Sequence, residues 1–357
     1  MKVLLISHFP LEGSGSGVYT KNIAKNLVNT GNEVYIIFPE NTTKIEGIEG
    51  ATLKPVYFKK AEEIAGQLPF NFPCFTTHPR SDSTFADLNE MQLEMYVEAF
   101  KVAIEEAIQI FNPDIIHTGH IWVLSEIASR YDIPTIITSH GTDIIGYNAL
   151  PKYRNYAKQA VERCNKIITI SDSNYEEVLK IFPNAVNKVE KILNGYDKNI
   201  FYKKEFYKKE ILHEILGIND TFENIILFTG RLVEVKGVDK LLEAAKIYET
   251  EDILTIIAGD GILREQLEKQ AEELRLKNVK FIGNKPQEIL NRLYNIADLS
   301  VLSSRYEAFG LVVIEALACG TPVVAVDIDV MKSFMKIKPI NLQYYIIYLI
   351  FPVAYCR

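Results

Sequence analysis

The sequence begins with the apolar run Met1-Lys-Val-Leu-Leu-Ile-Ser7, which the glycine-rich segment Pro10-Leu-Glu-Gly-Ser-Gly-Ser-Gly17 separates from an amphipathic stretch starting near Val18. The strand predicted at 3–7 has four consecutive apolar residues, 3–6, rather than an alternating pattern, which is typical of a strand buried on both faces of a parallel sheet. A buried strand, a glycine loop and a helix in this order predict the first unit of an α/β fold.

The same alternation continues along the chain. Further strands are predicted at 33–38, 115–117, 135–139 and 166–170, and helices at 18–30, 91–111, 123–131, 151–163 and 173–182. The pattern restarts after residue 200, with strands at 225–229, 254–258, 279–282, 299–302 and 322–326, and helices at 236–249, 262–274, 286–296 and 310–318. Strands and helices at this spacing form parallel sheets, so we predict two doubly wound α/β domains in tandem. Ligands of such domains bind at the carboxyl ends of the strands, and two facing domains would enclose a cleft.

The predicted domain boundaries follow from this repeat. We expect an N-terminal domain at 1–196, a linker region at 197–219, a second domain at 220–328 and an atypical tail at 329–357. The linker contains a charged run at 203–210, which we interpret as a solvated linker helix. The alternative is a basic face that touches a membrane surface.

The composition excludes several classes of protein. Hydrophobic residues make up 48% and charged residues 24% of the chain, as in ordinary soluble enzymes. Asp and Glu (46) outnumber Lys and Arg (39), giving a net charge of −7, which disfavours binding to nucleic acid through its phosphates. The apolar stretch at 344–356 is shorter than the roughly 20 residues of a membrane-spanning helix, and residues 1–7 lack the long apolar core of a signal peptide. The cysteines fit neither a zinc site nor a disulfide framework, so we expect a cytoplasmic location; they are Cys74, Cys164, Cys319 and Cys356.

The first candidate site is the glycine-rich segment itself. Gly15 and Gly17 would let the backbone approach an anion at the start of the following helix. The dinucleotide fingerprint GxGxxG does not fit, because Val18 or Thr20 stands where its last glycine belongs, and the Walker pattern is also missing. The alternative is a flexible loop without a ligand.

The second candidate is Ser139-His-Gly-Thr-Asp143, at the end of a predicted strand. His140 and Asp143 could present an imidazole and a carboxylate to one cleft, although a lone histidine at a strand end can also be structural.

The third candidate is Phe228-Thr-Gly-Arg-Leu-Val-Glu-Val-Lys-Gly237, which follows the first strand of the second half. Arg231 and Lys236 would place two cations at the end of the sheet, an arrangement suited to a diphosphate. The alternative is a solvated basic pair.

The most specific candidate runs from Ser303 to Pro322. A helix is predicted to begin at Gly310 and to stop at Gly320. The backbone N–H groups of Phe309, Gly310 and Leu311 would then form an anion site. Two carboxylates belong to the same stretch, Glu307 before the helix and Glu315 inside it. Because Glu315 lies in an otherwise apolar helix, we expect it to be hydrogen-bonded, to sugar hydroxyls or alternatively to a neighbouring Arg or Lys.

Taken together, these motifs resemble the retaining glycosyltransferases of family 4, which have two Rossmann-like domains in the GT-B architecture. The resemblance extends from Met1 to about Val326. It rests on the glycine-rich loop, Ser139–Asp143, Asn194-Gly-Tyr-Asp197, Gly230–Gly237, Gly259-Asp-Gly261 and the two glutamates eight positions apart, all in the family's order.

The resemblance implies roles for the matching positions. Glu315 would bind the ribose of a nucleotide-sugar donor, and Arg231 and Lys236 would neutralise its diphosphate. Glu307, with Phe309, Gly310 and Leu311, would hold the donor sugar and phosphate. His140 would lie beside the reacting sugar, and Gly15 to Gly17 would meet the phosphate. No cofactor and no metal are expected, and the acceptor would be a glycan, a lipid or a small molecule.

The sequence departs from the family after about residue 328, where a glycine-containing loop and further elements usually follow. We interpret 329–357 as a shifted or truncated segment that leaves the donor domain incomplete. An incomplete donor domain would leave a catalytically impaired sugar-nucleotide-binding protein, which is one alternative. A nucleotide-sugar epimerase of the same fold is a second alternative, independent of the tail. Contact with the inner face of a membrane is a further expectation.

Overall fold

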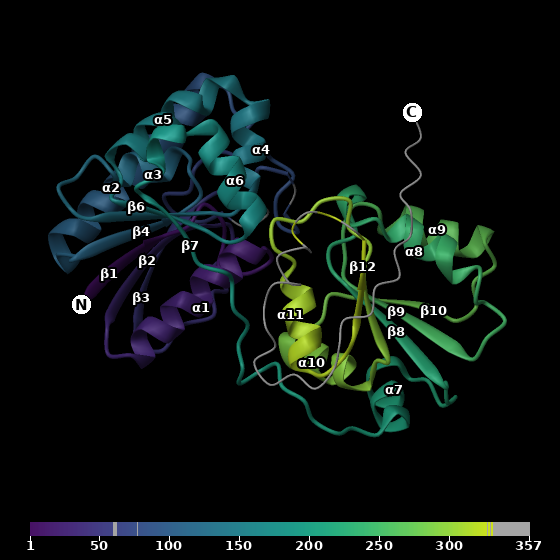
Figure 1. Ribbon diagram of the computed structural model, residues 1–357. Helices are drawn as coiled ribbons and strands as arrows, with labels where there is room; N and C mark the ends of the chain where they lie inside the picture. Colours follow the sequence, from purple (N-terminus) through teal and green to yellow (C-terminus); the bar gives the residue numbers. More distant parts are fainter. Residues whose placement is uncertain (60–62, 77, 327, 329, 331–357) are drawn as a thin grey trace. The chain divides into compact units, whose positions relative to one another are not determined.

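The computed structural model describes residues 1–59, 63–76, 78–326, 328 and 330 (Figure 1). Apart from residues 328 and 330, the predictions for the chain beyond residue 326 lie outside these ranges. The chain divides after Asn194 into two compact units, which we call unit 1 and unit 2 and describe separately.

Unit 1 contains a sheet of seven parallel strands in the order β3-β2-β1-β4-β5-β6-β7. The strands are β1 (Lys2–Ile6), β2 (Glu33–Glu40), β3 (Ala51–Tyr57), β4 (Ile115–Gly119), β5 (Thr135–Ser139), β6 (Lys166–Thr169) and β7 (Val189–Lys191). The helices are α1 (Gly15–Asn29), α2 (Glu90–Phe111), α3 (Val123–Ala128), α4 (Thr142–Ala149), α5 (Arg154–Arg163) and α6 (Asp172–Ile181). The strand order reverses between β1 and β4, the point at which doubly wound folds bind ligands.

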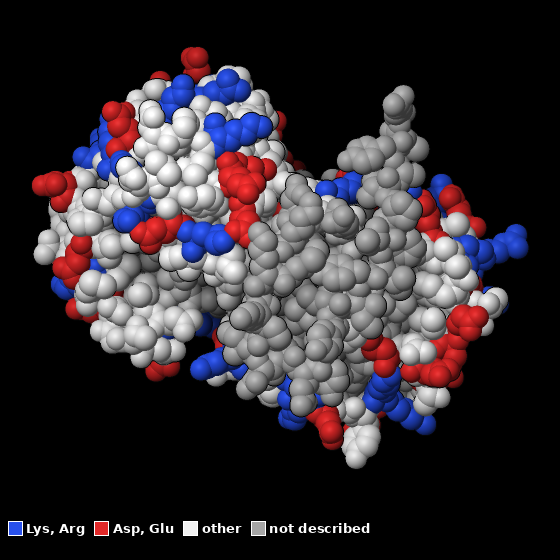
Figure 2. All heavy atoms as spheres, viewed as in Figure 1, with Lys and Arg blue, Asp and Glu red and all other residues white. Residues whose placement is uncertain are grey.

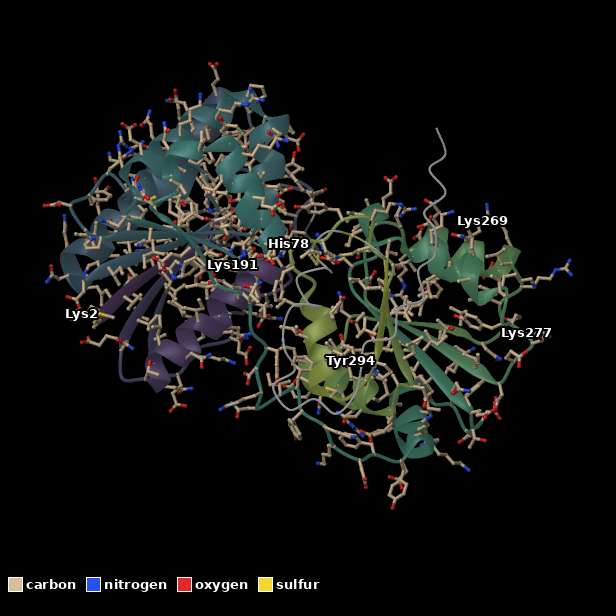
Figure 3. All side chains as sticks on the ribbon, viewed as in Figure 1. Lys2, His78, Lys191, Lys269, Lys277 and Tyr294 are labelled. Carbon is tan, nitrogen blue, oxygen red and sulfur yellow. The ribbon has the colours of Figure 1, made fainter. Side chains whose placement is uncertain are left out.

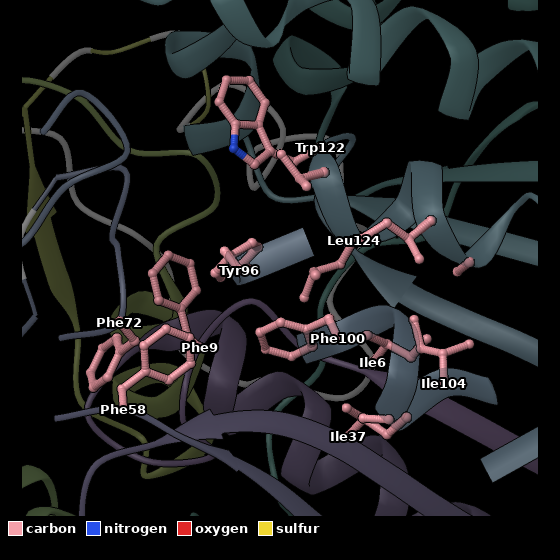
Figure 4. Packing of buried hydrophobic residues seen from close by; sticks show 14 of the residues in the cluster. Ile6, Phe9, Ile37, Phe58, Phe72, Tyr96, Phe100, Ile104, Trp122 and Leu124 are labelled. Carbon is pink, nitrogen blue, oxygen red and sulfur yellow. The ribbon is translucent and has the colours of Figure 1, made fainter. Parts of the chain in front are cut away.

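Both faces of β1 are buried, as its continuous apolar run predicts. Val3 and Leu5 pack against α1, whereas Leu4 and Ile6 join a larger cluster that includes side chains of α2 and α3. Figure 1 shows α1 and α2 on opposite sides of the sheet, and Figure 4 shows part of the larger cluster, in which Tyr96 packs against Phe100. The sheet is therefore sandwiched between helices and fixes the positions of the strand ends.

Unit 2 repeats the plan with five parallel strands in the order β10-β9-β8-β11-β12. The strands are β8 (Asn224–Thr229), β9 (Ile253–Ala258), β10 (Val279–Gly283), β11 (Leu299–Leu302) and β12 (Val323–Ala325). The helices are α7 (Lys208–Leu216), α8 (Val238–Ala245), α9 (Arg264–Glu273), α10 (Gln287–Ile296) and α11 (Leu311–Ala318). The order reverses between β8 and β11. The prediction of two doubly wound parallel-sheet units is thus confirmed.

Some elements were not predicted from the sequence. Strand β3 contains Lys54 and Pro55 and is only half-buried at the sheet edge, so it lacks a continuous apolar run. Strand β7 is three residues long, and α4 is a short helix after a strand end. The linker region also differs, because its helix is α7 rather than 203–210, and Lys208 of α7 pairs with Asp298 within unit 2.

The described surface shows no separation of charge by sign on the face in Figure 2, where acidic and basic side chains intersperse. Across the described ranges, every helix is either too short or too polar to cross a bilayer.

Candidate functional site

The candidate site of unit 2 lies where its strand order reverses, and two loops 70 residues apart in sequence meet there. One loop follows β8 and contains Lys236, and the other follows β11 and contains Ser303 and Arg305. The Arg305 backbone N–H donates to the Val235 carbonyl at 2.7 Å, and the Ser303 hydroxyl donates to the Lys236 carbonyl at 2.9 Å. The two loops are therefore held together by their backbones.

Within this junction, Lys236 forms an ion pair with Glu307. The Ser304 hydroxyl donates to the same carboxylate at 2.8 Å. The side chains of Lys236 and Glu307 are 20% and 11% exposed, so most of the pair is buried and a small part of it is accessible to solvent. The structure thus brings together a cation and a carboxylate that the sequence placed on separate motifs.

Arg231 follows Gly230 at the end of β8 and is half-buried. The backbone around it is fixed, because the Leu232 N–H donates to the Asp260 carbonyl at 2.8 Å and the Gly230 N–H donates to Ala258 at 3.0 Å. The motif Gly259-Asp-Gly261 therefore supports the Arg231 segment.

Helix α11 begins at Leu311, one residue later than predicted, and ends at Ala318. Gly310 precedes it with φ +87°, a left-handed conformation that favours glycine, and offers no side chain to cap the first turn. Phe309 is buried. The first-turn N–H groups and the helix dipole thus present positive potential close to the loop that carries Glu307.

Within the chain, the partner of Glu315 is Tyr294 rather than a neighbouring Arg or Lys, and its contact with sugar hydroxyls stays a prediction. Burial raises the pKa of its carboxyl to about 7, and a hydrogen bond from Tyr294 opposes this rise. The Tyr294 hydroxyl lies 3.4 Å from Glu315 Oε2 and 2.5 Å from Thr229 Oγ1. Tyr294 is labelled in Figure 3. Burial also raises the pKa of Tyr294, so that its hydroxyl stays protonated and can donate. Sequence reasoning missed Tyr294, because a tyrosine in an amphipathic helix gives no signal beyond core packing.

This contact leads to a prediction about stability. Tyr294→Phe is expected to lower the free energy of unfolding by about 1–3 kcal/mol, because Thr229 and Glu315 each lose a partner. The loss should grow as the pH rises through about 7, since the ionised carboxyl needs the Tyr294 proton most. Tyr248→Phe, which removes the hydroxyl 2.9 Å from Thr255, is the matched control. Urea unfolding over a pH series measures the free energy of unfolding of both variants. A loss in Tyr294→Phe that is the same at every pH would contradict the prediction.

In unit 1 the glycine-rich segment differs from its prediction. Helix α1 begins at Gly15 instead of near Val18, so Gly15 and Gly17 belong to its first turn. Ser14 caps this helix, and the Gly17 N–H donates to the Ser14 hydroxyl at 3.1 Å. A Cβ on Gly17 would lie 2.0 Å from the Pro10 carbonyl oxygen, so glycine is required there by close approach of the backbone. Gly15 is exposed. Their contact with phosphate stays a prediction.

His140 follows the carboxyl end of β5, as predicted, but neither its side chain nor the Asp143 carboxylate reaches an open surface, because both are buried. Asp143 is fully buried and accepts hydrogen bonds from the Ile121 N–H at 2.8 Å and the Ser139 hydroxyl at 3.2 Å. It also accepts one from the His140 N–H at 3.2 Å. Asp143 therefore joins the ends of β4 and β5 and fixes the backbone of His140.

Loss of Asp143 should accordingly destabilise unit 1. Asp143→Ala is expected to reduce the free energy of unfolding by about 3 kcal/mol, roughly one for each hydrogen-bond donor that is stranded. Asp132→Ala, at an exposed aspartate just before β5, should change it by less than about 0.5 kcal/mol. Chemical denaturation compares the two, and a similar small effect for both would contradict the role of Asp143.

A metal site is a separate question. Among the residues that the structure describes, no group of three or more His, Cys, Asp or Glu side chains is arranged to hold a metal ion.

Comparisons with known proteins match both units. Residues 13–199 match the family model described as Glycosyltransferase Family 4, and residues 208–336 match the model described as Glycosyl transferases group 1. An uncharacterized glycosyltransferase of Methanocaldococcus jannaschii, MJ1607, is 28% identical over 94% of this chain and 83% of its own length. A D-inositol 3-phosphate glycosyltransferase of Corynebacterium jeikeium is 27% identical over 91% of this chain and 80% of its own. Among solved structures, Anabaena HepE in complex with UDP-glucose matches with a TM-score of 0.66 at 20% identity, over 93% and 82% of the two chains. At 20% identity, the similarity to HepE shows that the two chains share a fold and no more than that.

Proposed function

The chain belongs to glycosyltransferase family 4, and from this premise we propose that it transfers a sugar from a nucleoside-diphosphate sugar to an acceptor hydroxyl with retention of the anomeric configuration. That it is a glycosyltransferase follows from the family; the donor, the stereochemistry and the acceptor are the proposal. The observation that carries it is the junction of Lys236, Glu307 and the start of α11 at the strand reversal of unit 2.

Unit 2 would bind the donor. Lys236, Arg231 and the first turn of α11 supply positive charge for the diphosphate, while the Glu315 carboxylate accepts hydrogen bonds from the ribose. Glu307, Phe309 and Gly310 lie beside the same helix start and would contact the donor sugar and its phosphate. HepE binds UDP-glucose, which supports a nucleotide-sugar donor for this chain.

In the proposed reaction, the bond between the anomeric carbon and the departing phosphate oxygen breaks as the acceptor oxygen bonds to the same face of that carbon. The acceptor proton passes to the departing phosphate oxygen, and the nucleoside diphosphate leaves. No enzyme nucleophile is needed. Fixed cations and backbone N–H groups stabilise the negative charge that develops on the leaving group, which is the contribution expected of a preorganised electrostatic site.

We propose that no metal takes part, because Lys236, Arg231 and the α11 dipole occupy the role that a divalent cation would have. We also propose that the enzyme is located in a reducing compartment such as the cytoplasm. If the acceptor is a lipid, the enzyme would contact the inner face of the membrane. Two cysteines in the described part of the chain, Cys164 and Cys319, are buried free thiols, which supports this placement.

The proposal is tested with the full chain and a panel of uridine, guanosine and adenosine diphosphate sugars. Release of the nucleoside diphosphate is measured with a mixture of sugar, polyol and lipid acceptors, and the product's anomeric configuration is determined by NMR. We expect acceptor-dependent release from one donor with retention. Binding without release from any donor, or an inverted product, would contradict the proposal.

A further inference from the structure

Asn194 and Gly195 form the only Asn-Gly pair in the sequence, and the chain divides into its two units between them. Neither residue belongs to a helix or a strand. In an Asn-Gly pair the main-chain nitrogen of the glycine can approach the preceding side-chain amide, because glycine has no side chain to obstruct the approach and its backbone rotates freely. The sequence therefore makes this peptide bond a candidate for covalent modification.

The main chain is fixed on both sides of this pair and is not fixed within it. On the side of unit 1, the Ile192 N–H donates to β6 at 3.0 Å. On the side of unit 2, the Asn199 N–H donates to Asp197 Oδ1 at 2.9 Å. Between these anchors, residues 193–196 make no hydrogen bond with any other described part of the chain. The Gly195 nitrogen is therefore not held by a carbonyl partner that it would have to leave before it reacts.

The side-chain amide of Asn194 is not held either. Its Oδ1 is buried and has no hydrogen-bond partner, a state that costs free energy and leaves the amide without a fixed orientation. Gly195 is exposed, and a Cβ added to it would meet no atom within 4 Å. The amide can therefore turn toward the Gly195 nitrogen without a clash, and water reaches the glycine.

The chain offers two internal comparisons. Asp260-Gly261 is the only Asp-Gly pair, but it is held in place: Arg264 donates to Asp260 Oδ2 at 3.1 Å, and a Cβ on Gly261 would lie 2.4 Å from the Leu232 carbonyl oxygen. Asn284 is exposed and lies outside the helices and strands, but a lysine follows it instead of a glycine. Only Asn194 combines a following glycine with an unheld main chain.

We propose that Asn194 undergoes spontaneous deamidation, with the Gly195 nitrogen as the attacking group and water as the only co-reactant. The Gly195 nitrogen bonds to Asn194 Cγ and loses its proton, the bond from Cγ to Nδ2 breaks, and the amide nitrogen takes up that proton and leaves as ammonia. Water then opens the resulting succinimide ring. Addition at Cγ gives aspartate, whereas addition at the main-chain carbonyl carbon gives isoaspartate, whose main chain runs through the former side chain.

The modification changes both the charge and the length of the chain at the boundary of the two units. Either product carries a carboxylate where the neutral amide stood. Isoaspartate also adds one carbon–carbon bond, about 1.5 Å, to the main chain. The boundary between Asn194 and Gly195 is therefore the point at which this chemistry would alter the connection between the units.

The test follows the full chain at neutral pH without any ligand. Samples taken over time are digested with trypsin, which cuts after Lys191 and Lys198 and so releases Asn194 in the peptide 192–198. Mass spectrometry measures the exchange of ammonia for water, and a sample digested at time zero corrects for modification during digestion. We expect conversion at Asn194 to be at least about tenfold faster than at Asn284, with isoaspartate among the products. Equal rates at the two asparagines would overturn the proposal.

Gly195→Ala tests the attacking group. Its Cβ has open space and its φ lies outside the left-handed region, so the variant should fold like the wild type, but the added methyl group hinders the approach of the nitrogen. Conversion at Asn194 should slow at least about tenfold. Gly47→Ala, at another exposed glycine with open space, is the matched control and should leave the rate unchanged. A wild-type rate in Gly195→Ala would overturn the proposal.

The effect on activity is measured on the isoaspartate form, separated from the intact chain by anion exchange, and this effect alone rests on the proposed function. Affinity for the nucleoside diphosphate should stay within about twofold, because the residues proposed to hold the donor in unit 2 lie after Gly195. Acceptor-dependent turnover should fall at least about tenfold, since a displacement of about 1 Å misaligns reacting groups. Equal turnover of the two forms would overturn this effect. Absence of turnover with every donor would contradict the proposed function alone, because the deamidation is measured by mass.

Discussion

Lys236→Ala is expected to reduce turnover about 10²- to 10³-fold, with a smaller effect on donor affinity. The Lys236 ammonium is held at the reversal point of the unit 2 sheet by Glu307, beside the start of α11. In the proposed reaction its charge matters most when the diphosphate gains negative charge on leaving, so its loss should raise the barrier more than it weakens binding. Initial rates at saturating donor, together with equilibrium binding of the nucleoside diphosphate, measure the two effects separately.

Lys240→Ala is the matched control. Lys240 lies in α8 of the same unit and also pairs with a glutamate, Glu243, but both side chains are exposed. This variant should keep turnover within about twofold of the wild type, because an exposed pair contributes little. If both lysine variants retain wild-type turnover, Lys236 does not stabilise the leaving group.

Glu315→Gln is expected to change both stability and donor binding, in opposite directions. The Glu315 carboxyl has a pKa of about 7 in the folded chain against an ordinary value of 4.5. A raised carboxyl pKa means that its contribution to stability is present below about pH 4.5 and is lost as the pH rises through about 7. The amide does not ionise, so the variant should be more stable than the wild type at alkaline pH, by up to about 3 kcal/mol.

Donor affinity should fall in the same variant by about tenfold or more, because a carboxylate accepts the ribose hydroxyls more strongly than an amide. In the wild type, affinity should weaken as the pH falls below about 7 and the carboxyl becomes protonated, whereas the variant should show no such dependence. Glu288→Gln, at an exposed position of α10, is the control. Calorimetric binding across pH measures the affinity. A parallel pH dependence in Glu315→Gln and the wild type would exclude Glu315 as the titrating group.

The sequence was sufficient for those parts of the fold that have a strong local pattern. Strand β1 is apolar on both faces, and Gly310 and Gly320 bracket α11 within two residues of its ends. Strand β3 was not predicted because its place at the sheet edge leaves it half-buried, with Lys54 and Pro55 in the run. Whether a strand lies at the edge or in the middle of a sheet depends on all the other strands. A short stretch of sequence therefore does not predict it.

The candidate site shows the same division. Lys236, Glu307 and Glu315 were predicted because charged residues in loops at strand ends, and a glutamate in an apolar helix, are unusual. The Lys236–Glu307 pair, however, joins positions 71 residues apart, and only the order of the strands brings them together. Asp143 was predicted with the wrong orientation, since the spacing to His140 does not say which way a carboxylate points.

The position of a nucleoside-diphosphate sugar in crystals of the complex tests the central claim most directly. We predict electron density for the diphosphate between Lys236 and the first turn of α11, with Arg231 within hydrogen-bond distance of it and the ribose hydroxyls on Glu315. A diphosphate found elsewhere on the chain, with the Lys236–Glu307 pair and the start of α11 free of ligand, would contradict it.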